Sequence, residues 1–529
     1  MGFLKSLSSR LDKWLLAVLV FVVVYAAFLS VNLGLMSMQW DEVNHFTGGL
    51  LLVRGQLWQY VQTSSFYPPV FNLVTATYFV VAGASVFVGR FVAVSFSVLS
   101  ILLVFQIARR MYGAKTALVA SVLFSVMPGL VWLSRMAMIE TMLIFVFSVS
   151  MLFFFRWLQT SNERDRVLSI AALAVGVVVK YQMLVVTPII MLTSMLLWKR
   201  DYLKTQINRF LQLKFLIVAA AAIAVALVVV YELLASGLVD LLIYSVQVGT
   251  AEKSLYSVRF PIPIFYFVEM VWPYSDIHPI SLFLYVLGLL GLGLLAVRRK
   301  PQDKFLLLWF LVIYAVFTVI PNRQWRYVTL LFPVLAISAS SLIVSAYEKA
   351  QKTWRNAHVS LNRRWAAKLA AGILVVLTSV GVFYSCSDAY SWVAKDQLQV
   401  PIEQASQYAA QNLSVNQSVV VVFPLNYLNE YMVWFYLNAQ APRENSVWQY
   451  PKLAVDSYTP DLNTTEFIDL CLQRDVKYVF LYENGGETSY FNTTLTSRDV
   501  YGILSDTGRF TPQVSFGTEP NRIFILSFS

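Results

Sequence analysis

The chain has 529 residues, of which 58% are hydrophobic and 13% are charged, and its formal net charge is +11. A soluble domain carries about 45–50% apolar and about 25% charged residues, so this composition excludes a soluble enzyme, a disordered chain and a disulfide-stapled miniprotein. The mean hydropathy of +0.63 reflects long apolar runs that recur from Trp14 to about Cys386, which also excludes a receptor with a single span.

Apolar runs of roughly 17–25 residues, long enough to cross a membrane, follow one another along the chain. We expect about eleven transmembrane helices, the first of them retained because no Ala-x-Ala-type cleavage site follows it. The predicted spans are Trp14–Met36, Phe91–Ala108, Thr116–Leu133, Met138–Trp157, Val167–Val179, Met183–Trp198, Phe215–Ala235, Pro279–Val297, Phe305–Ile320, Val328–Ala346 and Lys368–Cys386. Val70–Gly83 is apolar but short, so we expect an interfacial or re-entrant segment there.

The distribution of Lys and Arg gives the orientation. If Val70–Gly83 does not cross, most basic residues of the membrane part fall in alternate connections, which are then cytoplasmic by the positive-inside rule. The sequence therefore predicts an integral protein of the plasma membrane or an equivalent membrane, with a cytoplasmic N-terminus. The positive charge reflects topology, and we expect no nucleic-acid partner.

The end of the chain has a different composition. Residues 387–529 are polar and more acidic than basic, and we expect a small extracytoplasmic α/β domain there, after a transmembrane domain over 1–386. All four Asn-x-Ser/Thr sequons lie in this part, at Asn412, Asn416, Asn463 and Asn492. The predicted elements are helices at Ile402–Leu413 and Asp461–Arg474 and strands at Ser418–Phe423, Val476–Tyr482 and Arg522–Phe528.

Charged residues are rare in the predicted outer connections, and charges at membrane depth are candidates for a functional site. The acids are Asp41, Glu42 and Glu140, and the cations are Arg135, Lys180, Arg323 and Arg326. A carboxylate can take a proton from a hydroxyl nucleophile, and arginine can hold a phosphate with two hydrogen bonds. A structural role stays open for each residue alone, because acids suit helix N-termini and lysines snorkel to the membrane surface.

Several short motifs follow one another along the chain, and each has a predicted side of the membrane. They are Asp41-Glu42, Tyr67-Pro68-Pro69-Val70-Phe71, Gly83, Arg90, Arg109-Arg110-Met111-Tyr112-Gly113, Ser134-Arg135 with Glu140, Val179-Lys180-Tyr181 and Arg326-Tyr327 followed by Pro333. This series resembles the large membrane glycosyltransferases of the GT-C fold, of the protein O-mannosyltransferase and aminoarabinose-transferase type (glycosyltransferase family 39). The likeness covers roughly Trp14 to Ala346, and it departs from the family at Glu140, where Asp is more usual.

The resemblance implies a glycosyltransferase that moves a sugar from a polyprenyl- or dolichyl-phosphate donor to a hydroxyl-bearing protein, glycan or lipid acceptor. Transfer would take place at the outer membrane face with inversion. Asp41 would be the catalytic base, and Glu42 and Glu140 would order the site. The expected contacts to the donor phosphate are Arg90, Arg135, Lys180, Arg323, Arg326 and Tyr327. The expected acceptor cleft involves Tyr67, Tyr181 and His278, with the outer loops 37–90 and 237–278.

Cofactors and rival functions complete the expectations. The chain has no Gly-rich phosphate loop and no Asp-x-Asp motif, so we expect no nucleotide-sugar site; Asp41 and His45, at i and i+4, leave a divalent cation such as Mg²⁺ or Mn²⁺ open. A disulfide between Cys386 and Cys471 is also left open. The alternatives are a secondary transporter, for which no internal repeat is visible, and a membrane scaffold, which gives the outer charges no role.

Overall fold

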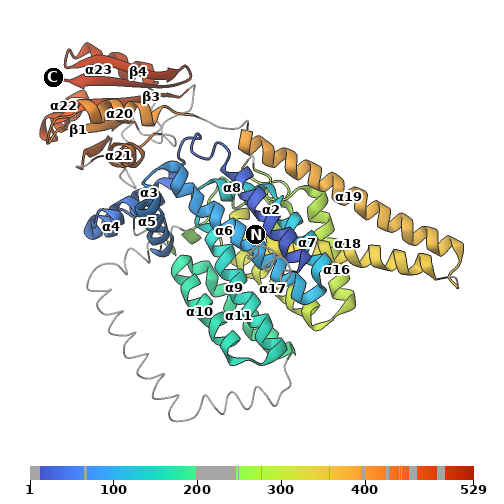
Figure 1. The fold of residues 1–529 in the computed structure, drawn as a ribbon. Helices are drawn as coiled ribbons and strands as arrows, with labels where there is room; N and C mark the ends of the chain where they lie inside the picture. The colour runs from blue at the N-terminus through green and yellow to red at the C-terminus, as the bar shows by residue number, and fades with distance from the viewer. Residues whose placement is uncertain are drawn as a thin grey trace, which may run out of the picture.

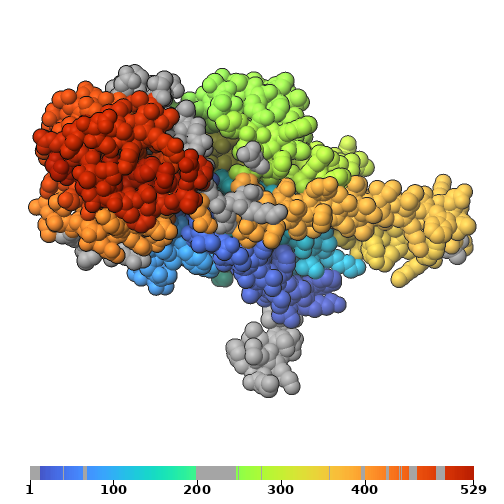
Figure 2. All heavy atoms as spheres, turned by 90° about the horizontal axis from the view of Figure 1, so that it is seen from above, coloured from blue at the N-terminus to red at the C-terminus, as the bar shows by residue number. Residues whose placement is uncertain are grey.

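The computed structural model combines a bundle of helices with a sheet domain at one end, and the hairpin of α18 and α19 extends away from the bundle (Figure 1). Seen from above, the sheet domain forms a separate mass opposite the projecting hairpin (Figure 2). The structure describes residues 12–64, 68–197, 243, 246–247, 249–275, 277–356, 358–394, 399–423, 428–439, 441, 444–451, 462–484 and 495–529.

Apolar helices make up the bundle and its outer segment. They are α2 (Lys13–Ser30), α6 (Val86–Tyr112), α7 (Ala114–Ser125), α8 (Pro128–Arg135), α9 (Ile139–Thr160), α10 (Glu163–Val179), η1 (Tyr181–Val185), α11 (Val186–Leu197), η2 (Ile262–Ile264), α15 (Phe265–Glu269), α16 (Leu282–Arg298), α17 (Pro301–Val319), η3 (Trp325–Leu331), α18 (Phe332–Arg355) and α19 (Leu361–Ala394). Among the described residues, six helices are long and apolar enough to cross a membrane, or seven if the bent pair α7–α8 is one span. The protein is therefore an integral membrane protein.

The predicted spans coincide with helices, apart from Phe215–Ala235, which lies outside the described residues. Three predicted continuous spans are broken, and one of them, Val328–Ala346, begins in the 3-10 turn η3 and continues as α18. Thr116–Leu133 is divided between α7 and α8, which meet at 64° where Pro128 begins the second helix. The span predicted from Met183 begins as the 3-10 turn η1 before α11. Hydropathy measures only apolar length, and so it does not detect such breaks.

Basic connections that the sequence predicts to be cytoplasmic meet at one end of the bundle. Arg109, at the end of α6, pairs with Asp12 before α2 at 2.7 Å. Arg298, at the end of α16, pairs with Asp303 of α17 at 2.6 Å, and the Tyr112 hydroxyl donates to the same carboxylate at 2.7 Å. Contacts between side chains therefore bring three connections together that are far apart in the sequence.

Helices α16 and α18 cross so closely that only glycine fits at one position. A Cβ on Gly291 would lie 2.3 Å from the main chain of Ser338, whereas a Cβ on Gly293, on the open side of the same helix, would meet nothing within 4 Å. Small residues allow membrane helices to approach in this way.

We expect Gly291→Ala to destabilise the protein by about 1–3 kcal/mol, because overpacking forces the two backbones apart. Gly293→Ala is the matched control and should leave stability unchanged or slightly raised, since alanine favours the helix. Thermal unfolding of the purified protein in detergent measures both. Equal melting temperatures for the two variants would contradict the close crossing.

Three short helices follow α2 on the side of the sheet domain: α3 (Trp40–Val53), α4 (Leu57–Ser64) and α5 (Val70–Ala82). The 13 residues of α5 reach about 20 Å at 1.5 Å per residue, less than the roughly 30 Å of a bilayer core. The helix ends at Gly83, whose φ of 82° is accessible to glycine. Its Phe79 ring lies 6.5 Å from Phe46 of α3, so α5 packs beside α3.

The C-terminal domain has a five-stranded sheet with the order β2-β1-β3-β5-β4. Its strands are β1 (Ser418–Val422), β2 (Ser446–Tyr450), β3 (Val476–Asn484), β4 (Phe510–Thr518) and β5 (Asn521–Phe528), and its helices are α20 (Ile402–Asn412), α21 (Glu430–Asn438), α22 (Thr464–Gln473) and α23 (Ser497–Asp506). Strands β1, β2 and β3 are parallel, and β5 is antiparallel to both β3 and β4. The predicted α/β character is confirmed, although β2, β4, α21 and α23 were not predicted.

The last helix of the membrane part extends past the predicted domain boundary. Helix α19 continues to Ala394 and so passes the expected end at Cys386. Nothing between Ser387 and Ala394 would stop a helix, because the first proline after the span is Pro401. The domain therefore starts after α19. Cys386 is exposed, Cys471 is buried, and both are free thiols.

The C-terminal domain docks directly on α3. The Phe435 ring of α21 stacks on Phe46 of α3 with centroids 5.4 Å apart. The Arg54 guanidinium, at the end of α3, donates to the carbonyls of Asn438, the last residue of α21, and of Ala441, which follows α21. The Ser37 hydroxyl, just before α3, accepts from the Val400 amide at 2.6 Å. Both ends of α3 are therefore fixed by the domain.

Candidate active site

Asp41 and Glu42 lie in the first turn of α3, where acids suit the helix dipole. Successive helical side chains point about 100° apart, so the two carboxylates face different surroundings. The Asp41 side chain is 34% exposed, and the Glu42 side chain is fully buried. Neighbouring acids of the same sequence motif therefore have different roles.

Glu42 forms the centre of a buried hydrogen-bond network. Its two oxygens accept from Nε and Nη2 of Arg90, each at 2.8 Å, and they also accept the main-chain amides of Gln39 and Ala137. The remaining N–H groups of Arg90 donate to the carbonyls of Leu33, Met36 and Ser37. All five guanidinium donors are thus used within the protein. Arg90 was expected to contact the donor phosphate, but it instead fixes the loop that leads into α3.

Four other charged residues form the cluster that we call the charge cluster: Asp41, Glu140, Lys180 and Arg326. Arg326 bridges the two acids, with Nη1 2.8 Å from Asp41 and Nη2 3.1 Å from Glu140. The Lys180 amine lies 3.0 Å from the same Glu140 oxygen. Two carboxylates and two cations make the cluster formally neutral.

Exposure increases from one end of the charge cluster to the other. The Glu140 side chain is fully buried and Lys180 is 9% exposed, whereas Arg326 is 21% and Asp41 is 34% exposed. Glu140 therefore acts as the inner counter-ion that positions both cations, and Asp41 is the carboxylate that an incoming molecule can reach. The four residues come from α3, α9, the α10–η1 junction and η3.

Two other arginines of the predicted phosphate set hold helix ends. Arg135 Nη1 donates to the carbonyls of Leu29 and Val31 at the end of α2, both at 2.6 Å. Arg323 donates to Thr318 at the end of α17 and to Ser257 in the outer segment. Helix C-termini leave carbonyls without partners, and these arginines satisfy them. Their charge and predicted side of the membrane do not distinguish them from Arg326.

The remaining predicted residues are placed differently. The Tyr327 ring lies 5.8 Å from the Lys180 amine, beside the charge cluster. The Tyr181 hydroxyl packs against Gly249, where a Cβ would come within 2.6 Å. His278 faces Asp388 of α19 at 3.7 Å, and no described contact joins it to the charge cluster. Tyr67 lies outside the described residues.

His45 was left without a role by the sequence, and the structure places it beside the charge cluster. Its Nδ1 lies 2.7 Å from Oδ1 of Asn72 on α5, and its ring meets Phe71 edge-on at 4.6 Å. Burial lowers the pKa of His45, so the imidazole is neutral, although Asp41 is close enough to oppose that shift. A polar Asn72 inside an apolar helix was the available signal.

These residues do not fit the divalent cation that the sequence left open. Asp41 and Glu140 already accept from Arg326 and Lys180, and one His45 nitrogen is bonded to Asn72. Within the described ranges, no group of three or more His, Cys, Asp or Glu side chains could hold a metal ion. Lys180 and Arg326 both lie against Oε1 of Glu140, and Arg326 also lies against Asp41, so a metal ion here would compete with two resident cations. Oε2 of Glu140 is buried and has no hydrogen-bond partner among the described residues.

The outer segment adds a residue that the predicted site omitted. Tyr256 lies within electrostatic range of Arg326 and Asp41, and burial raises the pKa of its hydroxyl. The hydroxyl therefore stays protonated at neutral pH and can donate a hydrogen bond beside Asp41. The aromatic character of residues 237–278 was the signal, but it did not single out this tyrosine.

Comparison with known proteins supports the resemblance seen in the motifs. The profile of the dolichyl-phosphate-mannose-protein mannosyltransferase family matches residues 67–235. No curated protein matches the chain by sequence. ArnT from Cupriavidus metallidurans has a similar structure in the apo state, with a TM-score of 0.63 and 13% identity over 97% of both chains. Its complex with undecaprenyl phosphate matches with a TM-score of 0.60 and 14% identity, over 97% of this chain and 98% of that one.

A second group of similar structures is archaeal. The oligosaccharyltransferase AglB from Archaeoglobus fulgidus, in complex with an inhibitory peptide and a dolichol-phosphate, has a TM-score of 0.55 and 12% identity over 97% of this chain and 74% of that chain. The A. fulgidus oligosaccharyltransferase in complex with Zn and sulfate has a TM-score of 0.51 and 12% identity, over 87% of this chain and 67% of that chain. The chain therefore has the GT-C fold of these membrane glycosyltransferases, as its sequence predicts.

Proposed function

We propose that the protein transfers a sugar from a polyprenyl-phosphate-linked donor to a hydroxyl-bearing acceptor at the outer membrane face, with inversion at the anomeric carbon. The observation that carries the proposal is the charge cluster, in which one reachable carboxylate, Asp41, lies beside two cations held by a buried acid. Inverting transfer needs a base for the acceptor and a cationic site for the leaving phosphate, and the cluster supplies both.

The chemistry divides between the two halves of the charge cluster. Asp41 takes the proton of the acceptor hydroxyl, whose oxygen then forms the new bond to the anomeric carbon. The bond from that carbon to the phosphate oxygen breaks, and the polyprenyl phosphate leaves with the electron pair. Arg326 and Lys180 hold the phosphate, since charge-assisted hydrogen bonds are the strongest that a protein offers. Arg326 also pairs with Asp41, and Glu140 keeps both cations in place.

The orientation that we propose follows the positive-inside rule. The end of the bundle where Arg109 pairs with Asp12 and Arg298 with Asp303 is cytoplasmic. The charge cluster and the C-terminal domain are then extracytoplasmic. Polyprenyl phosphates have their headgroups at the membrane surface, which is where α3, α4 and α5 lie in this arrangement.

Lys180→Ala and Arg326→Ala are expected to weaken binding of undecaprenyl phosphate by about tenfold or more, because a hydrogen bond to a charged group contributes about 1.5–3 kcal/mol and 1.4 kcal/mol corresponds to tenfold. Ligand-induced thermal stabilisation of the purified protein in detergent measures the affinity without turnover. Lys115→Ala is the control, because Lys115 pairs with Glu348 away from the charge cluster. Unchanged affinity in both cluster variants would remove the phosphate assignment.

A transporter or a scaffold receives no comparable support. Both leave the pairing of Arg326 with one reachable and one buried carboxylate unexplained.

A further inference from the structure

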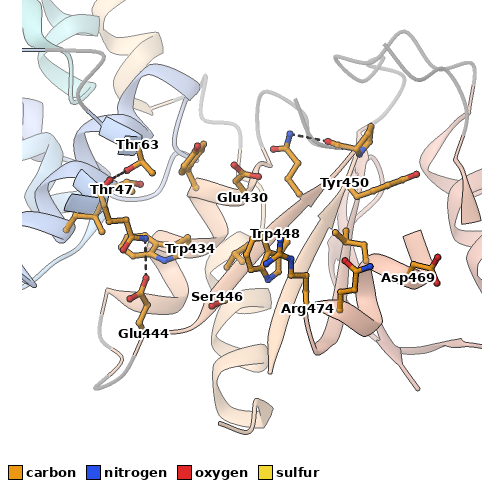
Figure 3. A pocket seen from close by; sticks show the side chains of 18 of the residues that line it. Thr47, Thr63, Glu430, Trp434, Glu444, Ser446, Trp448, Tyr450, Asp469 and Arg474 are labelled. Atoms are coloured by element: carbon orange, nitrogen blue, oxygen red, sulfur yellow. Dashed lines mark hydrogen bonds between the residues drawn. The ribbon is translucent and has the colours of Figure 1, made fainter. Parts of the chain in front are cut away.

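A cavity of about 820 Å³ lies between the α3–α4 pair and the β2 edge of the C-terminal sheet (Figure 3). This volume is typical of sites for small molecules. Thr47 of α3 and Thr63 of α4 line one wall, and Trp448 and Tyr450 of β2 line the other. The cavity thus lies at the interface between the helix that carries Asp41 and the C-terminal domain.

Contacts between the two walls hold the cavity open in a defined shape. Glu444, before β2, accepts from the side-chain amides of Gln56 and Gln59 at the start of α4. Arg54 donates to the Ala441 carbonyl at 3.0 Å, and Phe435 of α21 stacks on Phe46 of α3. The space is therefore part of a built interface and does not depend on one side chain.

Polar atoms in the cavity wall have hydrogen-bonding capacity that the protein does not use. The Thr47 hydroxyl, the Gln449 side-chain oxygen and the Trp448 indole nitrogen are buried and have no hydrogen-bond partner among the residues that the structure describes. Thr47 is 4% and Gln449 is 8% exposed. Buried polar groups are normally paired. The three atoms lie beneath the cavity surface on residues that line it, so a ligand with hydroxyl groups reaches them once these side chains rotate toward the cavity.

The charge of the cavity selects among such ligands. Four carboxylates line it against one cation, Arg474, which lies over the Trp448 ring at 4.1 Å. The carboxylates are those of Glu430, Glu444, Glu466 and Asp469. An anionic ligand would be repelled. Trp434 and Trp448 add aromatic surface for the apolar faces of a ligand. A neutral, hydroxyl-rich molecule satisfies all these features.

We infer that this cavity binds the acceptor, and that the acceptor is a neutral glycan. The link to transfer rests on the proposed function. Asp41 and Thr47 belong to the same helix, about 9 Å apart along its axis at 1.5 Å per residue. A glycan bound against Thr47 and Trp448 therefore lies along the helix that carries the proposed base, and the C-terminal domain supplies acceptor recognition.

The test is saturation-transfer NMR on the full-length protein in detergent, with the methyl glycosides of mannose, glucose, galactose and N-acetylglucosamine as probes. We expect at least one neutral glycoside to bind and mannose 6-phosphate not to bind. Trp448→Ala should weaken binding at least fivefold, whereas Trp58→Ala, which changes an exposed tryptophan of α4 outside the cavity, should not. Absence of binding by all four glycosides, or binding of the phosphate alone, would overturn the inference.

Thr47→Val keeps the inference testable if Trp448→Ala does not fold. Valine has nearly the same shape and removes the unpartnered hydroxyl, so glycoside binding should fall at least threefold while the melting temperature stays level or rises. Thr77→Val, on the exposed face of α5, is the control. Unchanged binding in Thr47→Val would refute the role of Thr47. Undecaprenyl phosphate binding is measured separately, so failure here leaves the donor site standing, and failure there leaves the cavity standing.

Discussion

Asp41→Asn is expected to abolish sugar transfer while leaving the protein folded. Asparagine keeps the shape of the side chain but cannot accept the acceptor proton, and a positioned general base contributes about 10²–10⁴-fold to a rate. The stability cost should be small, because the Asp41–Arg326 pair is partly exposed, and pairs of this kind contribute about 0–1 kcal/mol. Transfer from a labelled polyprenyl-phosphate sugar in membranes, together with thermal unfolding, measures both effects.

Asp388→Asn is the control for this experiment. Asp388 of α19 is also an acid of intermediate exposure. It faces His278 and lies outside the charge cluster. Its variant should transfer sugar at the wild-type rate. Transfer at the full rate by Asp41→Asn would refute the proposed base, whereas binding of undecaprenyl phosphate should survive this substitution because Arg326 and Lys180 remain.

Glu42→Gln is expected to fail in the opposite way, by unfolding the protein. The substitution leaves the Arg90 guanidinium buried without a counter-charge, and removing one partner of a buried ion pair costs about 3–5 kcal/mol. The main-chain amides of Gln39 and Ala137 each donate to one Glu42 oxygen, and glutamine keeps only one such acceptor oxygen. The melting temperature in detergent should fall sharply, and any loss of activity should follow the loss of folded protein.

Glu163→Gln provides the comparison for Glu42. Glu163 pairs with Arg166 one helical turn away on the exposed face of α10, and such surface pairs contribute about 0–1 kcal/mol. A melting temperature for Glu42→Gln as high as that of Glu163→Gln would show that the buried network around Arg90 does not stabilise the fold. Together the two experiments distinguish the neighbours: Asp41→Asn should change the transfer rate, and Glu42→Gln should change the stability of the fold.

The sequence singled out the charges of the outer connections but could not predict which of them meet. The alternation of basic connections predicts Lys180, Arg326 and Glu140 on one side of the membrane. In the structure, the Lys180 amine lies 3.0 Å and the Arg326 guanidinium 3.1 Å from Glu140. Arg135 and Arg323 share that predicted side, yet they donate to carbonyls at helix ends. Which carbonyls need a hydrogen-bond donor depends on the residue at which each helix ends, and hydropathy does not predict that residue.

The fold was predictable to a similar extent and for a related reason. Long apolar runs predicted the helices of the bundle, and buried runs such as Ser418–Phe423 predicted central strands of the sheet. Strand β2 was missed because it is an edge strand, exposed at Ser446 and half-buried at Val447 and Trp448, without a continuous buried run. The cavity at this edge, formed with α3 and α4, could not be anticipated for the same reason.

The fixation of α3 at both ends, by Ser37 with Val400 and by Arg54 with the segment after α21, bears on the construction of chimeras. A cassette that exchanges only the C-terminal domain with a relative would mismatch Phe435 against Phe46 and displace Asp41. The exchangeable unit is instead discontinuous, and it joins residues 37–83 to the chain after α19. A change of acceptor specificity by domain exchange should therefore succeed only when both pieces are moved together.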